Sequence, residues 1–202
     1  MIGVVDYGMG NLHSVEKALQ RLQASAIRLS DPVQADHCQA LLLPGVGAFD
    51  PAMQKLNSSG WSPVLQDWAQ AQRPLLGICL GLQLLFESSA EGREPGLGLL
   101  AGRVEPLPEQ AQERCPHMGW APLTKHQPSP LLADDEQPWM YFVHSFAAVA
   151  ADSSNVTATA PYGDEAVVAA VGRGSLQATQ FHPEKSGLCG LALLQRWLSS
   201  FH

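Results

Sequence analysis

The sequence predicts an α/β fold in which a mostly parallel sheet is covered by helices on both faces and carries added antiparallel strands in its C-terminal half. Two observations lead to this prediction. In the first half, continuous apolar runs alternate with segments whose apolar residues recur every three or four positions, a pattern typical of buried parallel strands between helices. In the second half, short strand-like runs are joined by turns rich in Gly, Pro and Asp, which favours antiparallel pairing.

The first half reads as a regular alternation of strands and helices. The apolar runs typical of strands are Ile2–Asp6, Ala26–Leu29, Ala40–Leu43 and Leu75–Ile78. Helical spacing predicts helices over Leu12–Leu22, near Phe49–Leu56 and over Ser62–Gln72, with a further helix after Cys79. Asn11 stands directly before the first of these helices, where its side chain can cap the free backbone N–H groups.

The second half is expected to contain further strands and one last helix. The strands are predicted at Arg103–Leu107, Trp120–Thr124, Met140–Ala147, Val156–Ala160, Ala166–Val171 and Leu176–Phe181. The most polar segment, Gln127–Pro138, predicts an exposed loop, and a final helix is expected near Leu188–Leu198.

Length and charge limit the kind of protein. We expect residues 1–202 to form one well-buried domain, because a second independent domain would need a longer chain. The net charge of −7, without a cluster of Lys or Arg, argues against a nucleic-acid surface. No apolar run is long enough to cross a bilayer, and the N-terminus lacks the basic region of a signal peptide. We therefore expect a cytoplasmic protein with neither a nucleic-acid nor a membrane partner.

The cysteines are expected to be reduced thiols. Cys38, Cys79, Cys115 and Cys189 show no C-x-x-C pairing, and a domain of this size does not need disulfides to fold. The spacing of Cys115, His117 and Cys189 matches no zinc pattern. The sequence therefore predicts no metal site and no cofactor.

Cys79 lies in the segment Gly77-Ile-Cys-Leu-Gly81, between an apolar strand and the start of a helix. This is the G-x-C-x-G form of a nucleophile elbow, in which flanking glycines remove side chains that would clash at a tight turn. The helix N-terminus is expected to favour the thiolate, and the turn amides, that of Leu80 among them, point to where an oxyanion would form. The alternative reading of the motif alone is a buried cysteine in a Gly-containing turn.

His182 is the predicted partner of the cysteine, because it lies in Gln180-Phe-His-Pro-Glu-Lys185 just beyond a predicted strand. Pro183 disfavours helical geometry for His182, and residues two apart in an extended chain point the same way. Glu184 can therefore orient the imidazole, which serves as the base for the nucleophile. The alternative reading is a surface turn with an incidental charge pair.

A second pair of glycines lies in Pro44-Gly-Val-Gly47, which follows the third predicted strand. This segment ends on the same edge of the sheet as the elbow, and its glycines allow a backbone conformation that few other residues permit. It can therefore supply the second N–H group of an oxyanion hole, or it is an ordinary turn between strand and helix.

Together with further segments, these motifs resemble the class I glutamine amidotransferases, and within them the glutaminase subunits of imidazole glycerol phosphate synthase. The further segments are Asp6-Tyr-Gly-Met-Gly-Asn11, Pro116-His-Met-Gly-Trp120, Tyr141-Phe-Val-His-Ser145 and His182-Pro-Glu-Lys-Ser186. They match in order and spacing from the first strand to the last helix. The resemblance implies the three-layer fold of that class over the whole chain.

The resemblance also implies a reaction, glutamine hydrolysis through a thioester, and assigns roles to individual residues. It implies a catalytic triad of Cys79, His182 and Glu184, an oxyanion hole of Val46, Gly47 and Leu80, substrate-binding residues Gln83, Glu91, Ser145 and Phe146, and a partner interface of Asn11, Trp120, Tyr141 and Lys185. A carboxylate for the substrate's α-ammonium and an amide for its α-carboxylate make chemical sense. A helix-surface position is the alternative for Glu91, and a buried core position is the alternative for Trp120 and Tyr141.

The implied partner is a (β/α)8-barrel cyclase in a heterodimer, because ammonia released into neutral water would be protonated and lost as a nucleophile. That cyclase makes imidazole glycerol phosphate and an aminoimidazole carboxamide ribotide in histidine biosynthesis. Family practice also implies low activity of the isolated glutaminase, since the Pro44–Gly47 segment reaches its productive form only with an occupied partner.

Two positions depart from the family pattern, Ala121 for Asn and Phe146 for Tyr. The first puts in doubt a polar contact near the docking face, and the second removes a hydroxyl.

Three alternatives remain on the sequence alone. The chain could be a glutaminase serving pyridoxal phosphate, anthranilate or guanylate synthesis, although these differ around Pro44-Gly-Val-Gly47. It could be a free-standing cysteine hydrolase or peptidase on the same architecture, which would need no partner. The third alternative is a non-catalytic binding subunit, which the intact Cys79, His182 and Glu184 argue against.

Overall fold

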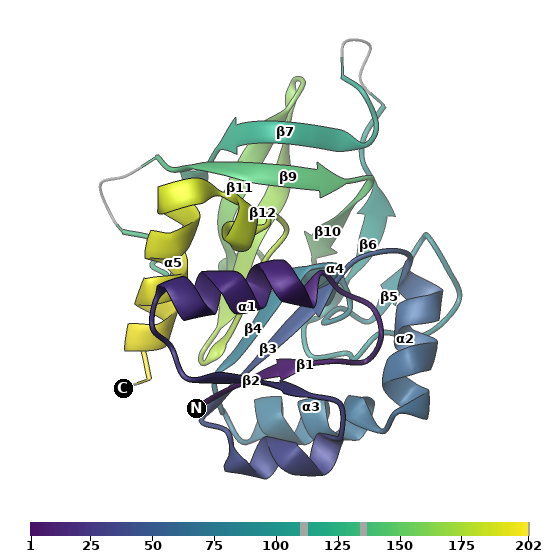
Figure 1. The fold of residues 1–202 in the computed structure, drawn as a ribbon. Coiled ribbons are helices and arrows are strands. Elements are labelled where there is room, and N and C mark those ends of the chain that lie inside the picture. The colour runs from purple at the N-terminus through teal and green to yellow at the C-terminus, as the bar shows by residue number, and fades with distance from the viewer. Residues whose placement is uncertain (110–112, 134–136, 202) are drawn as a thin grey trace.

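The centre of the molecule is a sheet of eight strands within residues 1–109, 113–133 and 137–201, which the computed structural model describes. Its strands are β1 (Ile2–Val5), β2 (Ala26–Leu29), β3 (Ala40–Gly45), β4 (Leu75–Cys79), β8 (Thr124–Lys125), β11 (Val156–Tyr162), β12 (Glu165–Arg173) and β13 (Leu176–Thr179). They lie in the order β2-β1-β3-β4-β13-β12-β11-β8 (Figure 1). The two halves of the chain meet where β4 pairs with β13, at the centre of this sheet.

The sheet is parallel on one side and antiparallel on the other. All neighbours from β2 to β13 run parallel, whereas β12, β11 and β8 pair in the antiparallel sense. This confirms the predicted mostly parallel sheet with antiparallel strands added by the C-terminal half. Parallel strands place their carboxyl ends at one edge, so the ends of β3, β4 and β13 open onto a common site.

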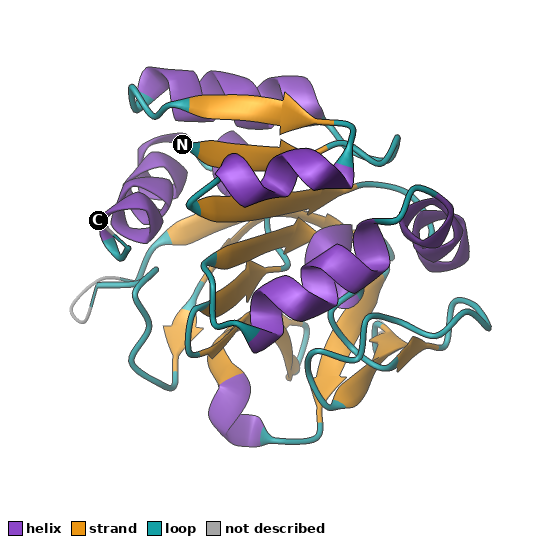
Figure 2. Cartoon of the chain, turned by 90° about the horizontal axis from the view of Figure 1, so that it is seen from below, coloured by secondary structure: helices purple, strands orange, loops and turns teal. Residues whose placement is uncertain are grey.

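Helices cover both faces of the sheet, which makes three layers (Figure 2). The principal helices are α1 (Leu12–Arg21), α2 (Phe49–Ser58), α3 (Trp61–Gln70) and α5 (Gly187–Ser199). Successive residues of β3 point into different layers, because side chains alternate along a strand. Leu42 packs with buried residues of α1 and α5, and Leu43 packs with those of α2 and α3. The strands are therefore continuously apolar, as their sequence predicted.

Two small sheets flank the central one and correct two of the predicted strands. They consist of β5 (Ser88–Ser89), β6 (Gly102–Pro106) and β10 (Phe146–Ala150), and of β7 (His117–Pro122) and β9 (Trp139–His144). The single strand expected at Met140–Ala147 was wrong, because the chain changes partners at Ser145, from β7 to β6. The strand expected at Trp120–Thr124 was also wrong, since it begins earlier and divides into β7 and β8 of different sheets.

Several local expectations can be compared with the structure. The cap of α1 is confirmed, because the Asn11 side chain accepts the backbone N–H of Ser14 at 3.4 Å. The segment Gln127–Pro138 is not wholly exposed, since Leu131 and Leu132 are buried in the core, and its residues 134–136 lie outside the described part of the chain. The described part of the chain also contains three short 3-10 helices, η1 (Pro32–His37), η2 (Ser153–Asn155) and η3 (Pro183–Lys185). Among the described residues, none of the helices has the length and apolarity to span a bilayer.

Candidate active site

Cys79 occupies a strained turn at the end of β4. Its backbone has φ 57° and ψ −112°, a region that costs a non-glycine residue roughly 1–3 kcal/mol. The following glycine explains how the chain turns so sharply. A Cβ on Gly81 would lie 2.0 Å from the carbonyl oxygen of Leu43, so only glycine lets the next helix pass directly against β3. This arrangement is a nucleophile elbow, with the sulfur held at the sheet edge.

The helix after the cysteine is shorter than a dipole argument needs. It is α4 (Leu80–Gln83), a single turn, after which the chain continues as irregular turns. The dipole of this helix can contribute only weakly to stabilising a thiolate, because the macrodipole builds up over several turns. Stabilisation of a thiolate must come mainly from neighbouring side chains and from the turn amides.

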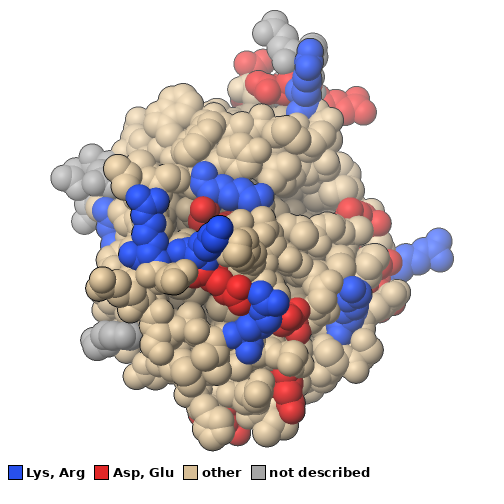
Figure 3. Space-filling view, in the orientation of Figure 1, with Lys and Arg blue, Asp and Glu red and all other residues tan. Residues whose placement is uncertain are grey.

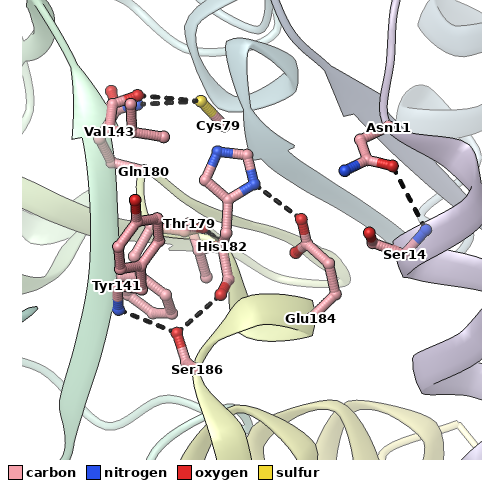
Figure 4. Close-up of polar contacts among 11 residues, drawn as sticks. Asn11, Ser14, Cys79, Tyr141, Val143, Thr179, Gln180, His182, Glu184 and Ser186 are labelled. Carbon is pink, nitrogen blue, oxygen red and sulfur yellow. Dashed lines mark hydrogen bonds and ion pairs between the residues drawn. The ribbon is translucent and has the colours of Figure 1, made fainter. Parts of the chain in front are cut away.

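His182 and Glu184 meet just beyond β13. The Nδ1 atom of His182 lies 2.7 Å from Oε1 of Glu184, and both side chains are almost fully buried (Figure 4). The expected contact forms by a different backbone route, since Glu184 belongs to the 3-10 helix η3 and only His182 is extended. The sequence argument from an extended chain was therefore wrong in its geometry, because Pro183 starts a 3-10 turn here.

The backbone of His182 is fixed by strand β9. Its N–H group donates to the carbonyl oxygen of Tyr141 at 3.0 Å. The Ser186 hydroxyl donates to the His182 carbonyl at 2.6 Å and accepts the Tyr141 N–H at 2.9 Å (Figure 4). With Nδ1 engaged by Glu184, the other ring nitrogen, Nε2, has no hydrogen-bond partner within the described residues and lies on the side of the ring toward Cys79 (Figure 4).

The charge state of His182 follows from its neighbours. Burial lowers the pKa of this imidazole, but contacts with Cys79 and Glu184 outweigh burial and raise the pKa to about 9. The ring is therefore protonated at neutral pH, with one N–H held by the carboxylate. Such an imidazolium can donate a proton to a leaving group and stabilise a thiolate beside it.

A cavity of about 410 Å³ opens over the sulfur and brings together most of the predicted site residues. The predicted residues that line it are Val46, Gly47, Cys79, Leu80, Gln83, Glu91, Ser145, Phe146, His182 and Lys185. Its other lining residues, to which the sequence assigned no role, are Pro116, Val143 and His144. Its volume suits a small-molecule ligand. Glu184 is not in the lining, since it contacts the far side of the His182 ring.

A buried amide network forms one wall of this cavity. Gln83 donates from Nε2 to the carbonyl oxygen of Phe146 and to Oε1 of Gln180, both at 3.0 Å. Both of its N–H bonds are thus used, and only the oxygen Oε1 is left to meet a ligand. An amide in this state accepts from an ammonium but cannot donate to a carboxylate, so the expected contact of Gln83 with a ligand's α-carboxylate does not fit this structure.

Glu91 reaches the cavity from the loop after β5. Its Oε2 accepts the backbone N–H of Phe49, the first residue of α2, at 2.9 Å. The carboxylate therefore caps this helix and still lines the cavity through its other side. It is not the free helix-surface residue of the alternative reading. A cationic group of a ligand would meet negative charge on this wall.

The sequence reasoning missed three buried groups around the sulfur. Gln180 is fully buried and donates from Nε2 to Sγ of Cys79 at 3.8 Å. Burial, together with the neighbouring Cys79, raises the pKa of Tyr7 far above its ordinary value, so this phenol stays neutral beside the elbow. Position 180 carried a usable signal, because it lies two residues before His182 on a predicted strand, which places both on one side.

His144 is the third of these groups, and it stays neutral. Burial lowers its pKa to about 4, against the opposing effect of its hydrogen bond to the Phe146 carbonyl. Its Nδ1 lies 2.8 Å from that oxygen and its Nε2 lies 3.3 Å from Nδ1 of His117. Because the carbonyl can only accept, Nδ1 of His144 carries the proton. His144 therefore holds the backbone at the Ser145 turn and takes no part in proton transfer near neutral pH.

The four residues expected at a partner interface lie on neighbouring elements. Trp120 of β7 and Tyr141 of β9 are cross-strand partners whose rings meet edge to face, with centroids 6.0 Å apart. Trp120 is 50% exposed, which decides against a buried core position for it. Lys185 follows in η3, which packs on β9, and the start of α1 with Asn11 lies beside η3 (Figure 4).

The outer face of β7 and β9 is apolar and uncovered. Met118 and Trp139 are also more than half exposed on it. In the view of Figure 3, acidic and basic side chains are mixed over the surface, while the area of β7 and β9 is largely uncharged. The departure at Ala121 does not touch this face, because its side chain is buried in the core beneath β7. Whether this departure alters a polar contact with a partner stays a prediction.

No group of three or more His, Cys, Asp or Glu side chains that could hold a metal ion occurs in the part of the chain that the structure describes. A sulfur nucleophile, a protonated imidazole and a carboxylate that orients it can catalyse acyl transfer from a small amide.

Comparison with known proteins identifies the family. The sequence profile described as "Glutamine amidotransferase class-I" matches residues 3–197. The chain therefore belongs to the class I glutamine amidotransferase family, which confirms the resemblance of its motifs and the predicted fold.

Its relatives narrow the position within that family. The chain is 56% identical over 199 residues to the imidazole glycerol phosphate synthase subunit HisH of Synechococcus sp. (strain CC9605), covering 98% of this chain and 93% of that one. It is 57% identical over 202 residues to the HisH subunit of Synechococcus sp. (strain CC9902), covering 100% and 95%. The subunit HisH 2 of Prochlorococcus marinus (strain MIT 9313) is 53% identical over 199 residues, covering 98% and 93%.

Solved structures share the fold at low sequence identity. A crystal structure titled as a glutamine amidotransferase superposes with a TM-score of 0.73 at 22% identity, over 98% of this chain and 97% of that one. The structure of PurLQS from Thermotoga maritima gives a TM-score of 0.73 at 20% identity, over 100% and 98%. At these identities the likeness concerns the fold alone.

Proposed function

We propose that the chain hydrolyses glutamine to glutamate and ammonia through a thioester on Cys79. The observation that carries this proposal is the strained elbow of Cys79 on the floor of a cavity, next to His182 in contact with Glu184 at 2.7 Å. The sulfur attacks the side-chain amide carbon, and the C–N bond breaks as His182 gives its Nε2 proton to the leaving ammonia. Water then adds to the thioester and returns a proton to His182, and the C–S bond breaks to release glutamate.

The remaining residues of the cavity fit the substrate's other groups. We assign the oxyanion to the backbone amides of Val46, Gly47 and Leu80, which line the cavity together with Cys79. We assign the α-ammonium to Glu91 and to Oε1 of Gln83, since both present acceptors. The α-carboxylate is left to the backbone around the turn of Ser145 and Phe146, where β9 ends and β10 begins.

The ammonia is used by a synthase partner. The relatives are named as subunits of imidazole glycerol phosphate synthase, so we propose a heterodimer with a (β/α)8-barrel cyclase of histidine biosynthesis. The docking face is the outer surface of β7 and β9, where Met118 is 64% and Trp120 50% exposed, continued by Asn11 and Lys185. Exposed aromatic side chains of this kind serve as interface anchors.

We further propose that residues 1–202 form one domain and that it works in the cytoplasm. The family profile spans residues 3–197, and the four cysteines are free thiols, which suits a reducing compartment. The names of the relatives favour this assignment over a glutaminase of pyridoxal phosphate or anthranilate synthesis.

A glutaminase assay with and without the cyclase and its nucleotide substrate tests this function. We expect glutamate release to rise steeply in the loaded complex and to vanish in Cys79→Ala. Cys189→Ala, which removes an exposed thiol of α5, is the matched control and should keep full activity. Strong hydrolysis of peptides or esters without the partner, with no preference for glutamine, would contradict the proposal.

A further inference from the structure

Gln180 touches the reactive sulfur and has no role in the function proposed so far. It lies just beyond β13, two residues before His182, and none of its surface is exposed. Its amide Nε2 lies 3.8 Å from Sγ of Cys79 (Figure 4). Burying a glutamine at this place costs free energy unless each of its polar atoms has a hydrogen-bond partner.

The orientation of the Gln180 amide is set by its neighbours. The carbonyl oxygen of Phe146 can only accept, so the atom of Gln83 that faces it at 3.0 Å is the nitrogen. The second N–H of that nitrogen donates to Gln180 at 3.0 Å, so the Gln180 atom that faces it must be the oxygen Oε1. Gln180 must then present its own N–H to the sulfur. The opposite flip would set two NH2 groups against each other.

We propose, on the basis of the glutaminase function above, that Gln180 is a catalytic residue that stabilises the Cys79 thiolate by donating a hydrogen bond to it. A donor fixed in a dry pocket favours a negative sulfur, because it replaces the water that would otherwise solvate the charge. The sulfur also lies 4.0 Å from the carbonyl oxygen of Val143, so the Gln180 amide at 3.8 Å is the nearer of these two polar contacts.

The Gln180 amide supplies stabilisation of the thiolate that was expected from the helix after Cys79. Because α4 is a single turn, its partial charge contributes little. Gln180 acts together with the protonated ring of His182, and the two approach the sulfur from alternate positions of the same segment. Gln83 is the positioning residue of this arrangement, since it holds Gln180 in the donating orientation.

Alkylation by iodoacetamide, resolved by peptide mass spectrometry, tests the proposal without any glutamine. Gln180→Met and Gln180→Glu both remove the donor, one with an apolar chain of similar length and one with an acceptor only. We expect Cys79 to react about tenfold more slowly near neutral pH, the loss expected when a hydrogen bond to a charged group is removed. The pH at which its alkylation reaches half its maximum should rise in both variants. His182 and Tyr7 also act on this sulfur, and His144 and Lys185 line its cavity, and all four are unchanged in the variants.

The other cysteines are internal controls. Cys115 and Cys189 are exposed and should react at the same rate in every protein, whereas Cys38 is buried and reports loosening of the fold. Gln177→Met is the matched control, since Gln177 is a buried glutamine of β13 whose amide bonds elsewhere, to the Gly174 carbonyl.

Each outcome decides the question. Unchanged alkylation of Cys79 with Cys38 still protected would overturn the proposal, and so would exposure of Cys38 in both variants, which would assign Gln180 a packing role. A wild-type protein that reacts rapidly at Cys79 but releases no glutamate with its partner would instead refute the glutaminase function and leave the hydrogen bond standing.

Discussion

The imidazole of His182 and the carboxylate of Glu184 lie 2.7 Å apart, and both side chains are almost completely removed from water. The pair is local in sequence, yet it forms only because Pro183 starts a 3-10 turn that carries the carboxylate back onto the ring. Glu184 can accept only from Nδ1, so the other nitrogen, Nε2, is left for the reaction at Cys79. The contact thus fixes the orientation of the ring and, together with Cys79, favours its protonated form.

Replacing Glu184 with Gln should shift the alkaline limit of glutaminase activity to lower pH. Against the effect of burial, Cys79 and Glu184 hold the pKa of His182 at about 9, so the ring keeps its proton below that pH and loses it above. Activity that needs this proton for the leaving ammonia therefore falls as the pH rises through about 9. Without the carboxylate, the fall should begin about 1–3 pH units lower.

The profile is measured as glutamate release by the complex with the cyclase, from pH 6 upward. The control is Glu165→Gln, which changes an exposed carboxylate of β12. Its activity should fall over the same pH range as that of the wild-type protein. If Glu184→Gln lowered the rate equally at every pH, the carboxylate would hold the ring in place without setting its charge.

The sequence predicted the parts of the fold that depend on local patterning. The four parallel strands of the first half were recognised because Leu42 and Leu43 are both buried, which makes the run continuously apolar. The break at Ser145 was not predicted, because the strand-like run resumes directly after His144 and Ser145 while the chain exchanges β7 for β6 as its pairing partner. Partner choice is a property of tertiary structure and leaves no mark on such a run.

The candidate site was predictable where the residues of a local motif indicate a particular backbone conformation. Cys79 was identified because glycines at 77 and 81 indicate a close approach, and the structure shows the contact that Gly81 avoids. The spacing of Gln180 from His182 indicates that both lie on one side of the segment, but no local feature indicates that the Gln180 amide meets the sulfur. The role of that amide depends on Gln83 and on the Phe146 carbonyl, which come from distant parts of the chain.

Removing the exposed indole of Trp120 should weaken docking of the cyclase without unfolding the glutaminase. Trp120 is half-exposed and stands edge to face with Tyr141, so its truncation costs little in the free chain. An interface anchor of this type contributes about 2 kcal/mol or more, which is roughly a 30-fold rise in Kd. Titration calorimetry with the cyclase measures it.

Val33→Ala is the matched control for docking, because Val33 is an apolar residue 75% exposed on η1, next to the opposite edge strand β2. Its Kd should equal that of the wild-type chain. An unchanged Kd for Trp120→Ala would mean that the cyclase binds elsewhere, and would remove the outer face of β7 and β9 from the proposed interface.

Gly81→Ala should destabilise the protein and disable the elbow at the same time. The added Cβ would meet the Leu43 carbonyl oxygen at 2.0 Å, and both atoms are tied to the backbone, so α4 must move away from β3. Overpacking of this kind costs about 1–3 kcal/mol, measured as a lower midpoint of denaturant unfolding. Gly10→Ala is the control, because the atoms nearest to its Cβ would be side-chain atoms of Leu12 and Pro44, at an ordinary contact distance of 3.5 Å or more. Because Cys79 and Leu80 move with α4, glutaminase activity should fall further than the loss of folded protein explains, whereas a proportional loss of both would show that the elbow tolerates the shift.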